Sequence, residues 1–365
     1  MDLTYLAHNG VVPETYDALL LVSFGGPDGP EDVLPFLANV THGRGIPAER
    51  LLGVAAHYQH FGGVSPINAA NRALRAAVEK EFAGHGIAMR VYWGNRNWHP
   101  LLPDTLAQMS RDGVRRALAF VTSAYSSYSG CRQYQDDIAA ARAAVGDLAP
   151  VVDKIRHYFN HPAFVAANAD AVRAALATLP ADRRGITHLV FTAHSIPSVM
   201  AEHSGPAGGL YVRQLRSAAA LVALAAAPRL PWELVWQSRS GAPQTPWLEP
   251  DVNDHLRALA AGGATAAVLS PVGFVSDHLE VVWDLDTEAA ATAAGLGLNF
   301  ARAATAGSDA RFAAMVRELV EERMLPDSPR QALGRLGPSH DRCPAGCCPP
   351  APPRTAAGQV SRSAL

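Results

Sequence analysis

Continuous apolar runs alternate with amphipathic stretches along most of this chain. The first run, Asp17–Phe24, is closed by Gly25-Gly26-Pro27. Runs of this kind are typical of strands that are buried on both faces of a parallel sheet. The same pattern predicts six further strands: Ala88–Gly94, Arg116–Ser123, His188–Ala193, Trp232–Gln237, Ala264–Leu269 and Asn299–Ala303.

In the segments between these strands, apolar residues recur with the period of a helix. This pattern predicts helices over Glu31–Val40, Pro66–Gly84, Pro103–Arg111, Gln133–Val145, Pro162–Thr178, Tyr211–Ala226, Asp251–Ala261, Asp277–Ala294 and Ser308–Glu322. Strands that alternate with helices predict βαβ units and parallel sheets. We therefore expect an α/β protein with two doubly wound, Rossmann-like parallel-sheet domains.

The 365 residues are enough for two domains. We place an N-terminal α/β domain at 16–160 and a C-terminal α/β domain at 161–307. A final helix at 308–325 and a cysteine-containing tail at 326–365 follow. The end of this tail, Pro349–Leu365, is rich in Pro, Ala and Ser, which predicts disorder.

Charge and hydropathy narrow the class of protein. The net charge is -2, so no basic field indicates nucleic-acid binding. The first 14 residues lack the basic and apolar regions of a signal peptide. The longest apolar stretch, Ala218–Ala227, has about half of the ~20 residues that span a bilayer. We expect a cytoplasmic monomer with no transmembrane segment.

Polar residues that follow the strands are candidates for chemistry, because ligands of open α/β sheets bind beyond the carboxyl ends of the strands. His194 follows the strand at His188–Ala193. An imidazole there can bind a divalent metal or accept a proton near neutral pH. A histidine that only bonds to a neighbouring loop is the other interpretation, and the sequence leaves both open.

Three carboxylates recur at intervals of four residues in the helix predicted at Asp277–Ala294. Glu280, Asp284 and Glu288 would lie along one face of that helix, with Ser276 as its N-cap. No Lys or Arg occurs between Asp277 and Ala301, and a row of hard oxygen ligands suits a divalent cation. A solvated acidic face is the alternative.

Two other features carry weaker signals. Ser65, in Gly62-Gly63-Val64-Ser65-Pro66, precedes a helix, and we interpret it first as a helix cap and second as part of an anion site.

The four cysteines are Cys131, Cys343, Cys347 and Cys348. Four thiolates can hold a 2Fe–2S cluster or a structural zinc ion. A flexible, oxidisable tail is the third possibility.

From about Asp17 to Glu322 the sequence resembles a known family, the ferrochelatases. Six motifs carry the resemblance: Val22-Ser23-Phe24-Gly25-Gly26-Pro27, Gly62-Gly63-Val64-Ser65-Pro66, Thr192-Ala193-His194-Ser195-Ile196-Pro197, Trp236-Gln237-Ser238-Arg239, Pro246-Trp247-Leu248 and Gly273-Phe274-Val275-Ser276-Asp277-His278-Leu279-Glu280. Each motif is modest alone, but six in order are specific. The resemblance implies a chelatase-type fold, with a porphyrin in a central cleft and a final helix that packs back on the first half.

The resemblance also implies residue roles. His194 and Glu280 match the essential histidine and glutamate, and with Asp284 and Glu288 they would handle the substrate iron. Phe24, Arg44, Tyr58, Ser65 and Tyr125 fall where the family lines the porphyrin. Some soluble relatives have at the position of Phe24 a Tyr that can ligate iron. Because Phe has no donor atom, His194 is the expected iron ligand here.

Substrate and cofactor follow from one bacterial branch of the family. Its cysteine pattern implies a 2Fe–2S cluster held by Cys131, Cys343, Cys347 and Cys348. Relatives of this form insert Fe²⁺ into coproporphyrin III, giving coprohaem in haem biosynthesis, and we expect this reaction. Protoporphyrin IX as substrate, a chelatase for another metal or tetrapyrrole, and a non-catalytic haem-binding protein remain the alternatives.

Overall fold

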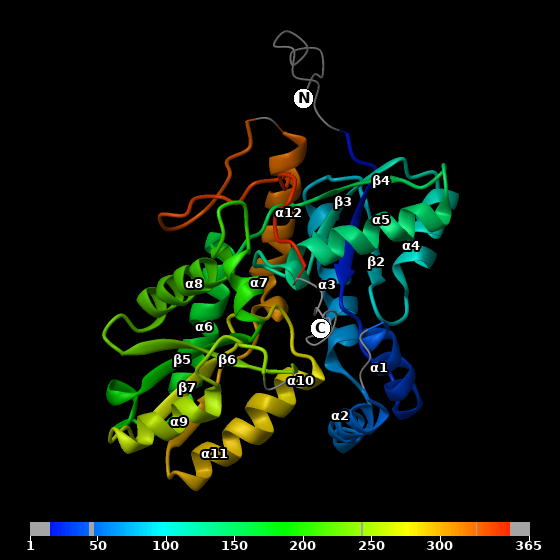
Figure 1. The fold of residues 1–365 in the computed structure, drawn as a ribbon. Coiled ribbons are helices and arrows are strands. Elements are labelled where there is room, and N and C mark those ends of the chain that lie inside the picture. Colours follow the sequence, from blue (N-terminus) through cyan, green and yellow to red (C-terminus); the bar gives the residue numbers. More distant parts are fainter. Residues whose placement is uncertain (1–14, 44–46, 242–243, 326, 351–365) are drawn as a thin grey trace, which may run out of the picture.

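Two parallel four-stranded sheets form the centre of the computed structural model, which describes residues 15–43, 47–241, 244–325 and 327–350 (Figure 1). The first sheet has the order β2-β1-β3-β4 and the second has the order β6-β5-β7-β8. The strands are β1 (Ala18–Ser23), β2 (Arg90–Asn95), β3 (Arg116–Val121), β4 (Val151–Lys154), β5 (His188–His194), β6 (Trp232–Gln237), β7 (Ala266–Ser270) and β8 (Asn299–Arg302). The predicted α/β fold with two doubly wound sheets is confirmed, and both sheets share one strand order.

The apolar run of β1 explains its central position. All six of its residues are buried. Because side chains of a strand point alternately to its two faces, Leu19 and Leu21 pack into one cluster, and Ala18, Leu20 and Val22 pack into another. A strand that is apolar on both faces needs a layer of helices on each side of its sheet.

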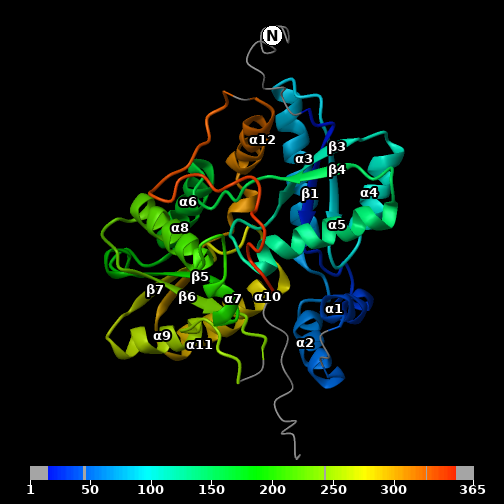
Figure 2. The ribbon, with the colours of Figure 1, turned by 45° about the horizontal axis from the view of Figure 1, so that its top comes forward.

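Helices on both faces of each sheet supply that cover (Figures 1 and 2). Those of the first half are α1 (Val33–Thr41), α2 (Ala48–His60), α3 (Pro66–Gly84), α4 (Leu102–Arg111) and α5 (Gln133–Val145). Those that follow are α6 (Pro162–Thr178), α7 (Ser198–Glu202), α8 (Leu210–Ala226), α9 (Val252–Ala261), α10 (Leu279–Val281), α11 (Ala290–Gly295) and α12 (Ala310–Met324).

The elements that were not predicted from the sequence include β4, α2 and the five-residue helix α7. The strand β4 reads Val-Val-Asp-Lys and lies at the edge of its sheet, so it lacks the apolar run that marks the other strands of that sheet. The helix α2 buries only Ala55 within its length. A helix with so small a buried face gives little periodic signal.

The single helix predicted at Asp277–Ala294 is wrong in its form. The segment consists of α10, a π-helix over Val282–Ala289, and α11. Its N-cap is His278, with extended backbone angles, and not Ser276. Arg302 explains the late start, because its guanidinium binds Asp277 with two hydrogen bonds of 3.0 Å and holds this residue outside the helix.

The last helix, α12, packs against both halves, with Phe312 against Phe164 of α6 (6.4 Å between ring centroids) and two ion pairs to the first half. Arg317 of α12 forms an ion pair of 2.9 Å with Glu81 of α3, and Glu322 forms a fully buried pair of 2.7 Å with Arg156. Both views draw α12 beside α3 (Figures 1 and 2). One continuous cluster of buried side chains includes Leu19 and Phe120 of the first sheet and Phe191 and Val268 of the second.

The described part of the tail, 327–350, is tied to the junction between the halves. The side-chain amide of Asn160 donates to the carbonyl oxygens of Leu333 (3.0 Å) and Gly337 (2.8 Å). Arg156 donates to the carbonyl oxygen of Gln331 at 2.8 Å. These bonds direct the chain toward Cys131, where the tail cysteines lie. Most of Pro349–Leu365 lies outside the described residues.

No helix among the described residues has both the length and the apolar character that crossing a bilayer requires.

Candidate active site and cysteine site

His194 and Glu280 face each other beyond the second sheet. His194 is the last residue of β5, and Glu280 lies in α10, which follows β7. The imidazole Nε2 lies 3.9 Å from a carboxylate oxygen of Glu280, and both side chains are partly exposed. Neighbouring parallel strands thus bring together two residues that are 86 positions apart (280 − 194) in the sequence.

The hydrogen bond of His194 sets which ring nitrogen is available. Its Nδ1 contacts the carbonyl oxygen of Ser195. A carbonyl only accepts, so Nδ1 carries the proton and Nε2 of the neutral ring presents a lone pair. Tyr211 donates its hydroxyl proton to the carbonyl oxygen of His194 at 2.8 Å and fixes the backbone there. Two acceptors, Nε2 and the Glu280 carboxylate, therefore face a space that suits a cation or a proton.

Asp284 is the most buried carboxylate of the acidic row. It accepts hydrogen bonds from the Ser238 hydroxyl and from the Gln237 amide, the latter at 3.2 Å. Burial raises the pKa of Asp284 to about 7, and the nearby charges of Glu280 and Glu288 act in the same direction. Near neutral pH this group is therefore able to exchange a proton for a metal ion.

Glu288 is the outer end of the row. Its side chain is exposed and accepts a hydrogen bond of 3.0 Å from the Trp283 indole. A cavity of about 190 Å³ is lined by Asp284 and Glu288, together with Gln237, Ser238 and Asp251. The three predicted carboxylates therefore run from the surface, through a buried position, to His194.

Other carboxylates of this segment have a structural role. Arg302 pairs with Asp277 at 3.0 Å and with Asp286 at 2.6 Å. Among the described residues, no Lys or Arg forms an ion pair with Glu280, Asp284 or Glu288. Arg302 lies one residue beyond Asp277–Ala301, the stretch without Lys or Arg. Its ion pairs separate Asp277 and Asp286 from the row of three predicted carboxylates.

Three of the predicted porphyrin-binding residues gather near the carboxyl end of β1. Phe24 directly follows β1, is 37% exposed and packs edge-on against Phe36. Tyr58 of α2 also contacts Phe36, and burial together with the charge of Glu280 raises the pKa of its phenol. Ser65 occupies the N-cap position of α3 without a capping hydrogen bond.

Ser65 fits closely against Gly26. A Cβ atom added at Gly26 would lie 2.6 Å from the Cβ atom of Ser65, so only glycine is tolerated there. The expected side-chain cap is therefore absent, because the hydroxyl of Ser65 is turned into this contact. The side chain is 3% exposed.

The remaining two predicted porphyrin-binding residues are placed differently. Tyr125 is buried in the core and donates its hydroxyl proton to the carbonyl oxygen of Val272 at 2.7 Å, which connects the two halves. Arg44 lies outside the described residues.

An aromatic contact between the halves was missed from the sequence. The rings of His57 in α2 and Trp283 in the π-helix stack with a centroid distance of 3.9 Å and an angle of 9°. The helix α2 was itself not predicted, so no signal pointed to His57. Gln237 and Ser238, in contrast, stand in a motif that the sequence singled out.

The four cysteines come together between Cys131 of the first half and Gly205 of the second. Cys131 lies in a π-helix over Tyr128–Arg132, and its sulfur is 4.0 Å from that of Cys343. The sulfurs of Cys347 and Cys348 are 3.8 Å apart. All four cysteines are free thiols, and Cys131, Cys347 and Cys348 are buried.

Hydrogen-bond donors surround these sulfurs. The Gln135 amide lies 3.4 Å from the sulfur of Cys343 and 3.7 Å from that of Cys131, and the Gly205 N–H donates to Cys348 at 3.0 Å. The hydrogen bond from Cys131 lowers the pKa of Cys343, with His340 and Gln135 adding to the effect. A thiolate at Cys343 is the form that binds metals.

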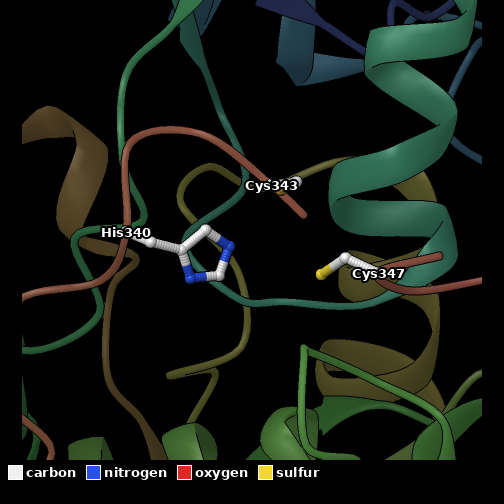
Figure 3. A group of neighbouring side chains, drawn as sticks. All are labelled: His340, Cys343 and Cys347. Atoms are coloured by element: carbon white, nitrogen blue, oxygen red, sulfur yellow. The ribbon is translucent and has the colours of Figure 1, made fainter. Parts of the chain in front are cut away.

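His340 adds a nitrogen donor that the sequence interpretation did not include. Its ring and the sulfurs of Cys343 and Cys347 offer ligand atoms that lie within 4.8 Å of one another (Figure 3). The spacing His340–Cys343–Cys347 was the signal that the sequence offered for this histidine.

Comparisons with known proteins agree with this geometry. The family described as Ferrochelatase matches residues 16–324. A coproporphyrin III ferrochelatase of Streptomyces griseus is 57% identical over 361 residues, which covers 94% of this chain and 96% of the relative. A protein of the same name from Nocardia farcinica is also 57% identical, over 350 residues, with 94% and 99% covered.

Among solved structures, SirB from Bacillus subtilis with Fe³⁺ resembles this chain in fold. The TM-score is 0.50 at 10% sequence identity, and the match covers 86% of this chain and all of SirB. At this level of identity, the likeness concerns the architecture only.

Proposed function

This chain belongs to the ferrochelatase family, and on that premise we propose that it inserts Fe²⁺ into coproporphyrin III to give coprohaem in haem biosynthesis. The observation that carries the proposal is the pair His194 and Glu280, which face each other across 3.9 Å within a chain that matches its relatives over nearly its full length. The enzyme class is that of a lyase.

The reaction makes two demands that this pair can meet. Two pyrrole N–H protons must leave the porphyrin, and one Fe²⁺ must lose its water ligands and enter the ring. A neutral imidazole and a carboxylate are both bases and both metal ligands. We propose that His194 offers Nε2 to the ring or the iron, and that Glu280 takes the opposing part of the proton and metal transfer.

We propose that the acidic row supplies the iron. Fe²⁺ would first meet the exposed Glu288, pass to Asp284 and reach Glu280. The raised pKa of Asp284 means that this carboxylate gives up a proton when it binds a metal ion, which keeps its affinity moderate near neutral pH. Moderate affinity suits a site that must release its cargo.

Residues near β1 would hold the porphyrin. We propose that Phe24 and Tyr58 contact the ring and that Ser65 and Arg44 act toward its carboxylates, as the family resemblance implies. Tyr125 would act from within the core, through its bond to Val272. Phe24 has no donor atom, which favours His194 as the iron ligand.

We also propose that Cys131, Cys343, Cys347 and Cys348 hold a 2Fe–2S cluster. The fit rests on four free thiols that approach one another in two close pairs, and on amide donors directed at three of the sulfurs. Hydrogen bonds to the sulfurs of such clusters set their reduction potential. A bound cluster supplies one-electron redox chemistry, and His340 is a further donor beside it.

We also propose that the two domains meet between residues 160 and 161. We propose further that the protein is a cytoplasmic monomer. The continuous buried cluster shared by both halves supports a molecule in which the two domains fold together.

An anaerobic insertion assay tests the proposed reaction. Purified protein, Fe²⁺ and either coproporphyrin III or protoporphyrin IX are mixed, and the loss of free-porphyrin fluorescence is followed. We expect faster turnover of coproporphyrin III. Faster turnover of protoporphyrin IX would reverse the substrate assignment. A folded protein that inserts no iron into either ring would contradict the proposal and favour a haem-binding protein.

A further inference from the structure

A cavity of about 300 Å³ opens beside the cysteine site, on the face of α5 and β4. Its wall includes Gln135 and Cys343, and four of its lining residues are basic: Arg142, Lys154, Arg323 and Arg342. This volume is at the lower end of the ~300–1,000 Å³ that small-molecule sites occupy. It is separate from the residues assigned to iron insertion.

The two acids of the lining pair with arginines that lie outside it. Asp153 is bound by Arg116 at 2.7 Å, and Asp341 is bound by Arg330 at 3.2 Å. Neither of those two arginines lines the cavity. Neither of these two acids forms an ion pair with Arg142 or Lys154 of the lining.

Arg142 and Lys154 retain unused donors. In the part of the chain that the structure describes, neither forms an ion pair with a carboxylate. Arg142 donates to the carbonyl oxygen of Pro150 at 2.7 Å, and Lys154 donates to that of Ile155 at 2.9 Å. A guanidinium has five N–H donors and an ammonium has three. Both half-buried groups can therefore donate further hydrogen bonds to a ligand.

We infer that this cavity binds a small oxyanion with two or more negative charges, through Arg142 and Lys154. Paired cationic donors on a concave surface favour phosphate or a dicarboxylate over neutral or cationic molecules. Binding depends on the protein surface alone and does not require the proposed cluster.

The position of the cavity couples such an anion to the cysteine site. Gln135 lines the cavity and also donates to the sulfurs of Cys131 and Cys343. Lys154 lines the same cavity as Cys343. An anion beside Lys154 would offset its charge.

Isothermal titration of the full-length, metal-loaded protein tests the inference. Inorganic phosphate and succinate are the probes, and acetate is the monovalent comparison. We expect saturable binding of phosphate, succinate or both, and the two titrations identify which oxyanion class the site prefers. Binding should weaken at least tenfold in the double variant Arg142→Gln/Lys154→Gln. Arg111→Gln removes a positive charge from α4, outside the cavity, and should leave binding unchanged.

Several outcomes would overturn the inference. They are the absence of binding by both divalent probes, equal binding of acetate, and equal affinity in the double variant and in the wild type. Lys154→Arg keeps the charge and should keep the affinity, so it separates charge from folding. Iron insertion is measured separately, and a protein that inserts iron but binds no oxyanion would contradict this inference while leaving the proposed function standing.

Discussion

After β3 the chain enters the π-helix Tyr128–Arg132, and after β7, the equivalent strand of the other sheet, it enters α10 and the π-helix Val282–Ala289. Such helices are rare and are frequently found at functional sites. The first carries Cys131 and the second carries Asp284. One topology thus presents soft sulfur donors in one half and hard oxygen donors in the other.

The surroundings of the two π-helices differ in charge as well. Asp284 lies between Glu280 and Glu288, which raise its pKa and favour the exchange of a cation. The sulfurs of Cys343 and Cys348 accept hydrogen bonds from amides, and the pKa of Cys343 is lowered there, chiefly by its hydrogen bond with Cys131. The comparison teaches that the fold provides a position after the third strand of each sheet, and that the side chains around this position give it a sulfur or an oxygen character.

The largest expected effect would separate the two halves by function. His194→Ala should reduce iron insertion by about 10²–10⁴-fold, because it removes the proposed base and iron ligand. The variant should keep the visible absorption of the proposed 2Fe–2S cluster. Cys131→Ser should abolish that absorption. The control His203→Ala changes an exposed histidine on α7's C-cap and should keep both signals. Loss of the cysteine-site absorption in His194→Ala would contradict the separation.

A second test concerns the acids that do not take part in metal transfer. Arg302→Met should lower the free energy of unfolding by about 3 kcal/mol, since it leaves Asp277 and Asp286 without their partly buried partner. Chemical denaturation measures this change. Arg257→Met removes an exposed pair on α9 and should change stability by less than about 1 kcal/mol. Equal effects of the two variants would contradict the distinction between structural and functional acids.

The junction between the halves predicts a sensitivity to acid. Burial lowers the pKa of His161 to about 4, and burial also raises the pKa of Glu318, 3.3 Å away, so the pair favours its neutral form. The unfolded chain binds this proton near pH 6.5, before the folded protein does. His161 should therefore lower stability by up to about 3 kcal/mol between pH 6.5 and pH 4, and protonation of Glu318, whose folded-state pKa is raised, offsets part of this loss.

Denaturation midpoints at several pH values measure this loss. His161→Asn keeps an acceptor at the N-cap of α6 but has no group that titrates, so its stability should depend less on pH in this range. His203→Asn, at an exposed position, should behave as the wild type does. An unchanged pH dependence in His161→Asn would contradict the assignment.

The smallest expected effect concerns the contact between the two halves. A double-mutant cycle with His57→Ala and Trp283→Phe should give a coupling energy of about 0.5–1.5 kcal/mol, the usual range for an aromatic pair. The matched cycle pairs His85→Ala with Trp283→Phe. His85, an exposed residue that follows α3, should show no coupling. A coupling near zero for His57 would show that this stack does not hold the halves together.

Much of the fold was predictable from the sequence because the central strands are apolar on both faces. The run Asp17–Phe24 predicted β1 to within one residue at each end, and α3 and α5 were predicted with their observed bounds. The edge strand β4 and the surface helix α2 were not predictable in this way. Their side chains meet solvent on one side or more, so hydrophobic periodicity carries little information about them.

The candidate site was predictable where one strand ends in a reactive residue. His194 follows an apolar run, and Glu280 lies in a segment of recurring carboxylates. The role of Arg302 was not predictable, because it depends on a contact between β8 and the loop before α10. The same holds for His57, His340 and the cavity beside Cys343, each of which depends on segments far apart in the sequence.

The separation of Cys131 from Cys343 by 212 positions has a consequence for the order of events during synthesis. At the usual elongation rate of about 5–20 residues per second, the ribosome needs roughly 10–40 s to make the chain between them. During that interval the thiol of Cys131 has emerged while its partners do not yet exist. Any metal group shared by these cysteines is therefore acquired late, after the half that carries His194 and Glu280 has been made.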